Sequence, residues 1–420
     1  MPSWNFFLAL PPNFGRIGSL MARGPLDGIR LIEVSEWVSG PYCGKLLAEL
    51  GAEVTKVETP VGDPARRLGP FPQDNPDPEK SALFLYLNTS KSGVTINLEH
   101  PEGNTLFQEM LREADVLVLD KQPHERQRLG LEYPALRQAN PALVVTSITP
   151  FGLTGPYSNY RTYHLNRYHA GGNGYLITTG KEYLDRPPLQ GPGFLADYQS
   201  GLGAAIATLG AVYVSRLTGE GQEIDCSQQE WCLGLDSIFV NKYPNEGILV
   251  SRAQMGYAIG GVMPCKDGYV MLMLVEGHHW DRLMEAMGAP PWSKEERFGT
   301  QYSRTQNGDE VNRRIAEFLM QHTREEIGQW GLDRGIPVGP IASPREAMDS
   351  EQFRSRDFFQ ILDHSRAGSL PYPGIPFKSS LEVPTDSHAA PLLGQHTADV
   401  LFRLGYSGKE VARFRAKGAI

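Results

Sequence analysis

The stretch that decides the fold is Ile29–Glu58, IRLIEVSEWVSGPYCGKLLAELGAEVTKVE. It opens with a short apolar run rich in β-branched residues, Ile29–Val34, which predicts a strand. Three leucines at helical spacing between positions 46 and 50 then predict a helix, which Gly51 ends. Val54–Val57 predicts the next strand. A strand, a helix and a strand in about thirty residues predict a parallel pair joined by a crossover helix.

The same alternation of strand and helix patterns continues as far as position 150. Further apolar runs predict strands at 94–98, 116–119 and 143–148. The sequence therefore predicts an α/β fold with a mostly parallel sheet covered on both faces. Residues 150–196 are instead rich in Gly, Pro and Tyr, which is typical of a functional loop region, and an amphipathic helix follows near 199–216.

A chain of 420 residues predicts more than one domain. We expect four segments: an N-terminal extension at 1–24, a large Rossmann-like domain at 25–224, a small α/β domain at 225–345 and a Pro-rich C-terminal segment at 346–420. The small domain has a strand pattern at 269–274 and helix patterns near 278–287 and 308–322.

Composition excludes several classes of function. The net charge is −8 and there is no basic run, which argues against nucleic-acid binding. The short apolar run near the N-terminus is broken by Pro11-Pro12 and no stretch approaches the length of a membrane span, so we expect neither a secretory signal nor a membrane partner. Four cysteines without a CxxC pair are typical of a reduced, cytoplasmic protein.

Common cofactor and metal motifs are missing from the sequence. The turn after the first strand has no GxGxxG and carries Pro41, which argues against a nicotinamide or flavin dinucleotide. There is no GxSxG and no HExxH. His278 and His279 are adjacent, so we do not expect them to share one face as metal ligands. The sequence predicts no metal site.

One carboxylate stands out, Asp197 in the segment GPGFLADYQSG at 191–201. It follows a Gly/Pro loop and precedes the helix predicted near 199–216. It could be an N-cap, whose carboxylate accepts backbone N–H bonds. It could also be a reactive carboxylate kept ionised by the positive end of the helix. Both interpretations can hold together.

Several spaced motifs give the chain a family resemblance. Gly40-Pro41, the segment LLAELGAEVTKVE at 46–58 and Gly62-Asp63-Pro64 resemble the opening of the class III CoA-transferases, the group of formyl-CoA and carnitine CoA-transferases with α-methylacyl-CoA racemase as a relative. The similarity continues through segments at 87–95, 114–118, 128–131, 140–141, 151–156 and 219–222. It implies a Rossmann-like large domain built from both chain ends, a smaller middle domain and an interlocked dimer.

The resemblance also implies a mechanism. The family nucleophile is an Asp in an ADxxxG or GDxxxG segment, which Asp197 matches. Its carboxylate would attack an acyl-CoA thioester to form a mixed anhydride and then an aspartyl-CoA thioester. A Gly-rich loop lies over this intermediate in similar enzymes, and here the best match is 256–261, with Gly260 and Gly261. A plain turn is the alternative interpretation of these glycines.

A second position of the family carries a Tyr-acid pair in transferases and a His-Asp pair in racemases, and here it holds Tyr163-His164. Because Tyr163 replaces the His that a racemase needs, α-proton exchange is disfavoured. We expect His164 to line the acyl pocket beside the nucleophile, although a structural loop histidine is the alternative. The substrate pocket is expected at Tyr163, Tyr168 and Tyr198, and the aromatic and polar residues at 157–168, Arg167 among them, suggest the acceptor side.

The CoA side departs from the family pattern, because 90–92 and 120–124 lack two arginines that similar proteins have there. The expected CoA-binding residues are Val38, Ser39, Lys56, Arg66, Lys91, Asp120, Lys121 and Gln122. The missing arginines leave room for a supporting subunit in a hetero-oligomer instead of an active homodimer. The implied substrates are a CoA thioester and a small carboxylic acid, with no permanently bound cofactor.

Overall fold

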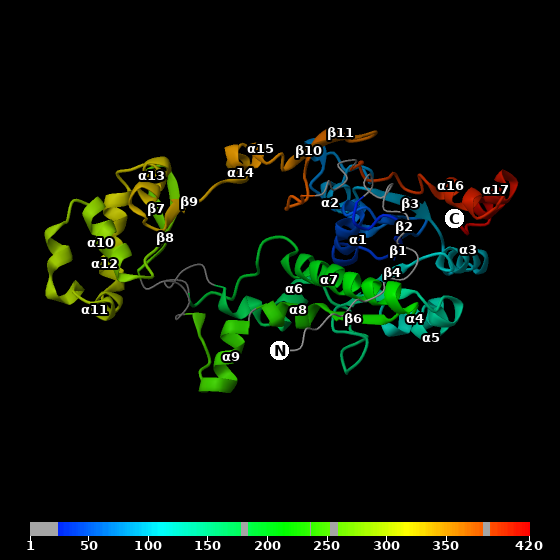
Figure 1. Ribbon diagram of the computed structural model, residues 1–420, viewed down its shortest axis with the longest axis horizontal. Coiled ribbons are helices and arrows are strands. Elements are labelled where there is room, and N and C mark those ends of the chain that lie inside the picture. The colour runs from blue at the N-terminus through cyan, green and yellow to red at the C-terminus, as the bar shows by residue number, and fades with distance from the viewer. Residues whose placement is uncertain (1–23, 178–183, 236, 253–258, 381–386) are drawn as a thin grey trace, which may run out of the picture. The chain divides into compact units, whose positions relative to one another are not determined.

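The computed structural model describes residues 24–177, 184–235, 237–252, 259–380 and 387–420 (Figure 1). It divides into two compact units. The large unit comprises Met1–Leu249 and Phe358–Ile420, and the small unit comprises Val250–Asp357. The large unit is thus built from the two ends of the chain. The boundary that the sequence suggested between 224 and 225 falls inside the last strand of the large unit's sheet, β6.

The large unit is organised around a six-stranded sheet in the order β3-β2-β1-β4-β5-β6. Every neighbouring pair of strands is parallel, as the alternating pattern predicts. The strands are β1 (Arg30–Val34), β2 (Glu53–Glu58), β3 (Lys91–Thr95), β4 (Val116–Leu119), β5 (Val144–Thr149) and β6 (Glu223–Ser227). The strand order reverses between β1 and β4. In open parallel sheets, ligands bind at such a reversal, outside the carboxyl ends of the strands.

Helices cover both faces of this sheet, so each face has its own apolar core (Figure 1). One core joins alternate strand residues such as Leu31 and Val116 to α1 (Ser39–Glu49) and α7 (Leu195–Thr218). The other joins the intervening residues, such as Leu117, to the second set of helices. That second set is α3 (Pro101–Leu111), α4 (Pro123–Leu129), α5 (Tyr133–Ala139), α16 (Thr397–Arg403) and α17 (Gly408–Ala416).

The C-terminal part of the large unit lies along the edge strand β3. The backbone N–H of Ser90 donates to the carbonyl of His388, at 2.9 Å. Gly93 donates its N–H to Nδ1 of His396 and accepts from the N–H of the same residue. These hydrogen bonds satisfy backbone groups that an edge strand would otherwise leave open. The remaining elements of the large unit are α2 (Ala82–Leu87), α6 (His164–Ala170), α8 (Gln228–Leu235), α9 (Ser237–Glu246), β10 (Phe359–His364) and β11 (Gly368–Pro373).

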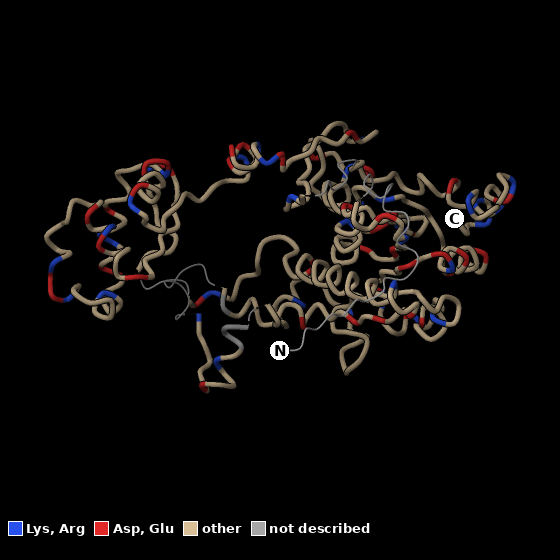
Figure 2. Tube along the Cα trace, in the orientation of Figure 1, with Lys and Arg blue, Asp and Glu red and all other residues tan. Residues whose placement is uncertain are grey.

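The small unit has an antiparallel three-stranded sheet and its own core. Its strands are β7 (Gly260–Cys265), β8 (Gly268–Met273) and β9 (Val338–Pro340). Its helices are α10 (Gly277–Ala286), α11 (Gln301–Gln306), α12 (Gly308–Leu319), α13 (Arg324–Arg334), α14 (Pro344–Met348) and α15 (Glu351–Ser355). The buried side chains of Val270, Leu272, Val311 and Ile315 hold the sheet against the helices. Both units carry interspersed acidic and basic residues along their described trace (Figure 2).

Helix α7 begins earlier than the sequence pattern suggests, at Leu195. It is also long and apolar enough to cross a membrane by length and composition alone. Its residues Ala204, Ala205 and Val212 nevertheless lie in the core beneath the sheet, which is how a central helix of a folded domain is placed. The early start puts Asp197 inside the first turn of α7.

Candidate active site

The carboxylate of Asp197 is buried, with 3% of the residue exposed, and four other side chains point polar hydrogens at it. Ser39 Oγ donates to Oδ1 at 3.2 Å and Arg167 Nη2 donates to the same oxygen at 2.5 Å. Gln228 Nε2 lies 3.4 Å from Oδ1. His164 Nδ1 lies 2.6 Å from Oδ2. Asp197 is therefore not the N-cap, which is Phe194; it is the third residue of the helix, and its oxygens bind side chains.

Four helix N-termini bring these groups together. Ser39 is the first residue of α1, His164 the first of α6 and Gln228 the first of α8, while Asp197 lies in the first turn of α7. The positive ends of helix dipoles favour an anion at such a junction. Gly201 permits the close approach, because a Cβ at that position would lie 2.5 Å from the carbonyl oxygen of Ser39. A glycine is therefore needed at this position of the ADxxxG segment so that α7 can pack closely against the start of α1.

The surroundings keep Asp197 ionised. Burial raises the pKa of its carboxyl group, but the hydrogen bond from His164 and the charge of Arg167 lower that pKa by a larger amount. The pKa of Asp197 therefore lies below the ordinary value. An ionised carboxylate only accepts hydrogen bonds, so Nδ1 of His164 carries the shared hydrogen. Within the described part of the chain, Nε2 of His164 and Nε of Arg167 are buried without a hydrogen-bond partner. Buried polar atoms without partners are uncommon outside functional sites.

A cavity of about 560 Å³ adjoins Asp197. Its apolar wall includes Ile148, Leu165 and Phe194. Of the predicted site residues, those lining it are Val38, Ser39, Asp120, Tyr163, His164 and Asp197. Arg167 also lines it and is the only Lys or Arg among the described lining residues. The carboxylates of Glu36 and Asp120 line it as well. The cavity therefore offers room for an acyl group beside three acidic side chains and one fixed positive charge.

A second cavity, of about 550 Å³, lies at the carboxyl ends of the strands around the reversal of strand order. It is lined by residues that follow β1, β2, β3 and β4, among them Thr59, Asn97 and Lys121, and by Arg128 of α4. Glu36 lines both cavities. The two spaces therefore border the same side chain.

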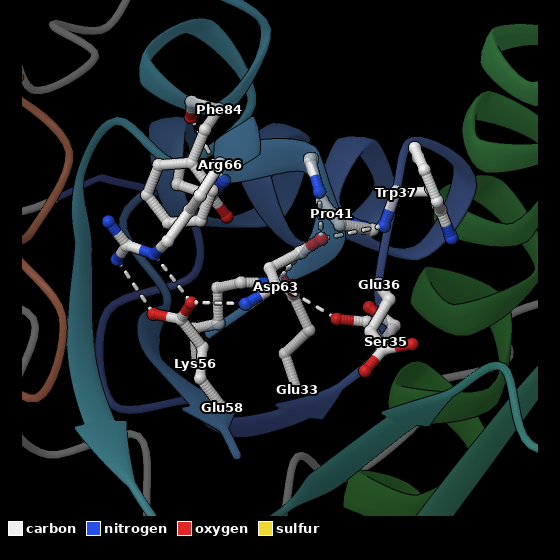
Figure 3. Close-up of polar contacts among 12 residues, drawn as sticks. Glu33, Ser35, Glu36, Trp37, Pro41, Lys56, Glu58, Asp63, Arg66 and Phe84 are labelled. Atoms are coloured by element: carbon white, nitrogen blue, oxygen red, sulfur yellow. Dashed lines mark hydrogen bonds and ion pairs between the residues drawn. The ribbon is translucent and has the colours of Figure 1, made fainter. Parts of the chain in front are cut away.

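Three cations expected to bind CoA phosphates are instead buried in the protein's own ion pairs. Figure 3 shows two of them, Lys56 and Arg66. Lys56 has no exposed surface and pairs with Glu33 at 3.1 Å and Asp63 at 2.9 Å. Lys91 is fully buried and pairs with the other oxygen of Glu33 at 2.7 Å. These ammonium groups cannot reach a ligand phosphate in this arrangement, so the structure corrects that expectation.

Arg66 is the third of these cations, and it is buried as completely. Its guanidinium binds both oxygens of Glu58, at 2.7 and 2.8 Å, and lies 3.6 Å from the centroid of the Phe84 ring (Figure 3). Burial opposes the charged form, but the bonds and charge of Glu58 outweigh it and raise the pKa of Arg66. Arg66 therefore forms a structural ion pair and does not face a ligand.

The three predicted residues after β4 have different positions. Lys121 Nζ pairs with Asp120 at 3.0 Å and with Glu36, which lines both cavities, at 3.7 Å. Burial lowers the pKa of Lys121, but the two carboxylates raise it by more. Gln122 donates through Nε2 to the carbonyl of Tyr160 at 2.7 Å and so fixes the loop before α6. Of these three residues, only Lys121 lines the second cavity.

The three predicted tyrosines do not share one role. Tyr163 lines the first cavity and is 81% exposed. Tyr168 is buried and stacks on His164 with ring centroids 5.9 Å apart, so it positions that imidazole. Tyr198 packs edge-on against Tyr42 and is not among the cavity's described lining residues. Only Tyr163 is therefore placed to touch a bound acyl group.

The predicted loop glycines and histidines lie in the small unit. Gly260 and Gly261 begin β7 with φ of +89° and +90°, which glycine adopts readily, and 256–258 lie outside the described residues. Their catalytic role stays a prediction.

The adjacent histidines of the small unit lie close together, contrary to our expectation. Possible metal-ligand atoms of His278 and His279 lie within 4.8 Å of one another and of Glu276, because both histidines occupy the first turn of α10. Nδ1 of His279 already accepts a hydrogen bond from the backbone N–H of Glu276.

Sequence reasoning missed Gln228 and gave Arg167 no defined role. Arg167 lies three residues after His164 in α6, so both side chains share one helix face. That spacing is the signal that could have identified Arg167 once His164 was placed. Gln228 had no comparable signal. It lies at the start of α8, after β6, and comes close to Asp197 only because the chain folds back from α7.

Comparison with known proteins identifies the family of the chain. The family model for CoA-transferase family III matches residues 26–397. Formyl-CoA:oxalate CoA-transferase of Rhodopseudomonas palustris is 30% identical over 94% of this chain and 97% of its own length. The alpha subunit of succinyl-CoA–L-malate CoA-transferase of Chloroflexus aurantiacus is 31% identical over 94% of this chain and 92% of its own.

A solved structure resembles the model over most of its length. A CAIB/BAIF family protein from Brucella suis has a TM-score of 0.81 and 28% identity, covering 91% of this chain and all of that one. The chain belongs to CoA-transferase family III.

Proposed function

We propose that the protein moves CoA from an acyl-CoA donor to a carboxylic acid through covalent intermediates on Asp197. The observation that carries this proposal is the buried, ionised carboxylate at the wall of a cavity large enough for an acyl group. A carboxylate is a weak nucleophile in water, but desolvation and fixed orientation make it effective at a bound thioester.

The first half of the reaction transfers CoA to the protein. An oxygen of Asp197 attacks the thioester carbonyl, the carbon–sulfur bond breaks, and a mixed anhydride and CoA thiolate result. The thiolate then attacks Cγ of Asp197 and expels the donor acid as its carboxylate. Asp197 is left as a CoA thioester, and no net proton transfer is needed.

The second half repeats these steps in reverse with the acceptor. The acceptor carboxylate attacks Cγ of the aspartyl thioester and expels CoA thiolate, which forms a second mixed anhydride. The thiolate attacks the acceptor's acyl carbon, releasing the new acyl-CoA and the free carboxylate of Asp197. Electron pairs and atoms balance at each step.

The donors around Asp197 have a second role in this scheme. Whenever Cγ becomes tetrahedral, one of its oxygens carries the developing negative charge. Ser39, Arg167 and Gln228 already aim hydrogens at Oδ1, and His164 aims one at Oδ2. They would therefore stabilise the oxyanion with little reorganisation, which is the principle of an oxyanion hole.

We place CoA itself across the two cavities. Its nucleotide would occupy the cavity at the reversal of strand order, with Lys121 and Arg128 beside the phosphates. Its pantetheine arm would pass Glu36, which lines both cavities, and bring the thioester to Asp197. With Lys56, Arg66 and Lys91 unavailable, Lys121 carries most of the phosphate recognition in this proposal.

The test is to trap the intermediate on the protein. The purified chain is mixed with succinyl-CoA or formyl-CoA, quenched with hydroxylamine, digested and analysed by mass spectrometry. We expect a hydroxamate on Asp197 and none in the Asp197→Asn variant. A modification at another residue, or full CoA exchange by Asp197→Asn, would sink the proposed mechanism.

A second candidate is a supporting subunit of a hetero-oligomeric transferase. Two relatives favour it, since the Chloroflexus protein is an alpha subunit and a benzylsuccinate CoA-transferase of Thauera aromatica, 29% identical, is also named as a subunit. CoA exchange by the purified chain alone would exclude this candidate. An acyl-CoA racemase remains the least favoured, and uptake of solvent deuterium at the α-carbon would revive it.

A further inference from the structure

Three carboxylates and one guanidinium are among the described residues that line the cavity beside Asp197: Glu36 and Asp120 pair with Lys121, and Arg167 pairs with Asp197. Arg167 is its only Lys or Arg within the described lining, and its side chain is 12% exposed. Its one ion pair in the described part of the chain is with Asp197, at 2.5 Å. Nη1 of Arg167 bonds to the carbonyl and the hydroxyl of Thr162, at 3.3 and 3.2 Å, and Nε has no partner among the described residues. The guanidinium is thus held in place and depends on Asp197 for charge compensation.

The proposed function, on which this inference rests, removes that compensation during every turnover. Asp197 is neutral once its carboxylate is converted into a CoA thioester. A guanidinium cannot release its proton at physiological pH, so Arg167 would then be a buried cation without an anion. Such a group is costly, and any carboxylate that restores the pair is bound favourably.

We propose that Arg167 binds the carboxylate of the acid substrate while Asp197 carries CoA. The geometry supports this exchange of partners. To attack Cγ of Asp197, the acid's oxygen must come within about 3 to 3.5 Å of that carbon. Nη2 of Arg167 already lies 2.5 Å from Oδ1, on the same carbon. The attacking carboxylate therefore enters the reach of a guanidinium that can hold it through two hydrogen bonds.

This arrangement makes acid binding depend on the state of the enzyme. In the resting enzyme Asp197 occupies Arg167 and repels a second carboxylate. In the aspartyl-CoA form the guanidinium is free and the repulsion is gone. Free acid therefore binds weakly to the resting enzyme and firmly to the covalent form, which prevents a dead-end complex in which acid blocks the entry of acyl-CoA.

The test uses the half-reaction with a single acid. Labelled succinate exchanges into succinyl-CoA through the aspartyl-CoA form alone. We compare the intact protein with Arg167→Gln and Arg167→Lys, and use Arg161→Gln, an exposed neighbour on the loop before α6, as the matched control. Two quantities are measured: the yield of Asp197 hydroxamate from succinyl-CoA, and the KM for succinate in the exchange.

We expect the KM for succinate to rise at least tenfold in Arg167→Gln and less in Arg167→Lys, with the control unchanged. The hydroxamate yield should fall by less than the KM rises, because Ser39, Gln228 and His164 still bind the Asp197 carboxylate. An unchanged KM for succinate in Arg167→Gln would overturn the inference while the proposed function stood. Equal losses of hydroxamate and of exchange in a folded variant, with no separate rise in the KM for succinate, would also overturn it, because Arg167 would then act on the nucleophile alone. Absence of hydroxamate in the intact protein would instead remove the proposed function itself.

Discussion

The large unit contains two clusters of buried charge that look alike in composition and differ in whether the described nitrogen atoms of their side chains all have partners. In the cluster around Lys56, every cation is paired with a buried carboxylate (Figure 3). In the cluster around Asp197, Nε2 of His164 and Nε of Arg167 lack partners among the described residues, and a cavity adjoins them. The cations of the first cluster stabilise the fold through ion pairs, whereas the second cluster has hydrogen-bonding nitrogen atoms that a ligand could use.

The comparison teaches that buried charge by itself does not identify a site. Burying an ion pair costs desolvation free energy, and good pairing recovers much of it, so a fully paired cluster can be purely structural. A site is marked by an ionised group whose neighbours have bonding capacity left over. Four predictions test whether the two clusters really divide in this way.

The largest effect is expected at the nucleophile. Asp197→Asn keeps the size of the side chain but removes the attacking charge, so CoA exchange should fall by at least about 10⁴-fold. Exchange is measured by chromatography of acyl-CoA products. Asp185→Asn, an exposed neighbour in the same part of the chain, is the control and should keep full activity. Comparable losses in both variants would mean that Asp197 has no special role.

The next effect is one of stability. Lys56→Met leaves Glu33 and Asp63 facing each other without their shared cation, which should lower the free energy of unfolding by about 3 to 5 kcal/mol. Urea unfolding measures this loss. Where the variant is still folded, its KM for acyl-CoA should match that of the intact protein. A raised KM with unchanged stability would return Lys56 to the CoA site.

The pH dependence of the first half-reaction separates the clusters further. The pKa of Asp197 lies below its ordinary value of 3.8, so its carboxylate persists as the pH falls to that value. Its contribution to stability is likewise present above 3.8 and is lost only as the pH falls through the lowered pKa. The rate of hydroxamate formation should therefore show no acid limb from Asp197 between about pH 5 and pH 8. In Arg167→Gln a lowering influence is gone, so the acid limb should move to higher pH.

The smallest effect is expected at the edge of the second cavity. Lys121→Gln removes the positive charge that pairs with both Glu36 and Asp120, and the KM for acyl-CoA should rise about 3- to 10-fold. Because the contact is electrostatic, added salt should raise the KM of the intact protein more than that of the variant. A salt response that the substitution leaves unaltered would assign phosphate recognition elsewhere.

The sequence predicts the scaffold well because its signals are local. The run at 116–119 is confirmed as β4, and the alternation of strands and helices is confirmed as a parallel sheet covered on both faces. Helix α1 starts at Ser39, ahead of the leucine pattern, because Pro41 fits the first turn. Such shifts are small, since a strand or helix is defined mainly by its own residues.

The site is less predictable because its contacts are remote. Ser39 and Asp197 are separated by 158 positions, and only the packing of α1 against α7 joins them. The partner of Lys56 is also remote in the sequence, which is why Lys56 was predicted to bind a CoA phosphate. Its true partner Glu33 is placed opposite it by the pairing of β1 with β2. Resemblance to a family located Asp197, whereas the roles of its neighbours required the three-dimensional arrangement.

The C-terminal residues that cover β3 have a consequence for how the protein is made. Synthesis proceeds from the N-terminus, so all six strands leave the ribosome long before His388 and His396 exist. Throughout that interval β3 is an uncovered edge, able to pair with the edge of another nascent chain. Chains whose synthesis stalls between the sheet and residue 388 should therefore be the ones that aggregate and recruit chaperones.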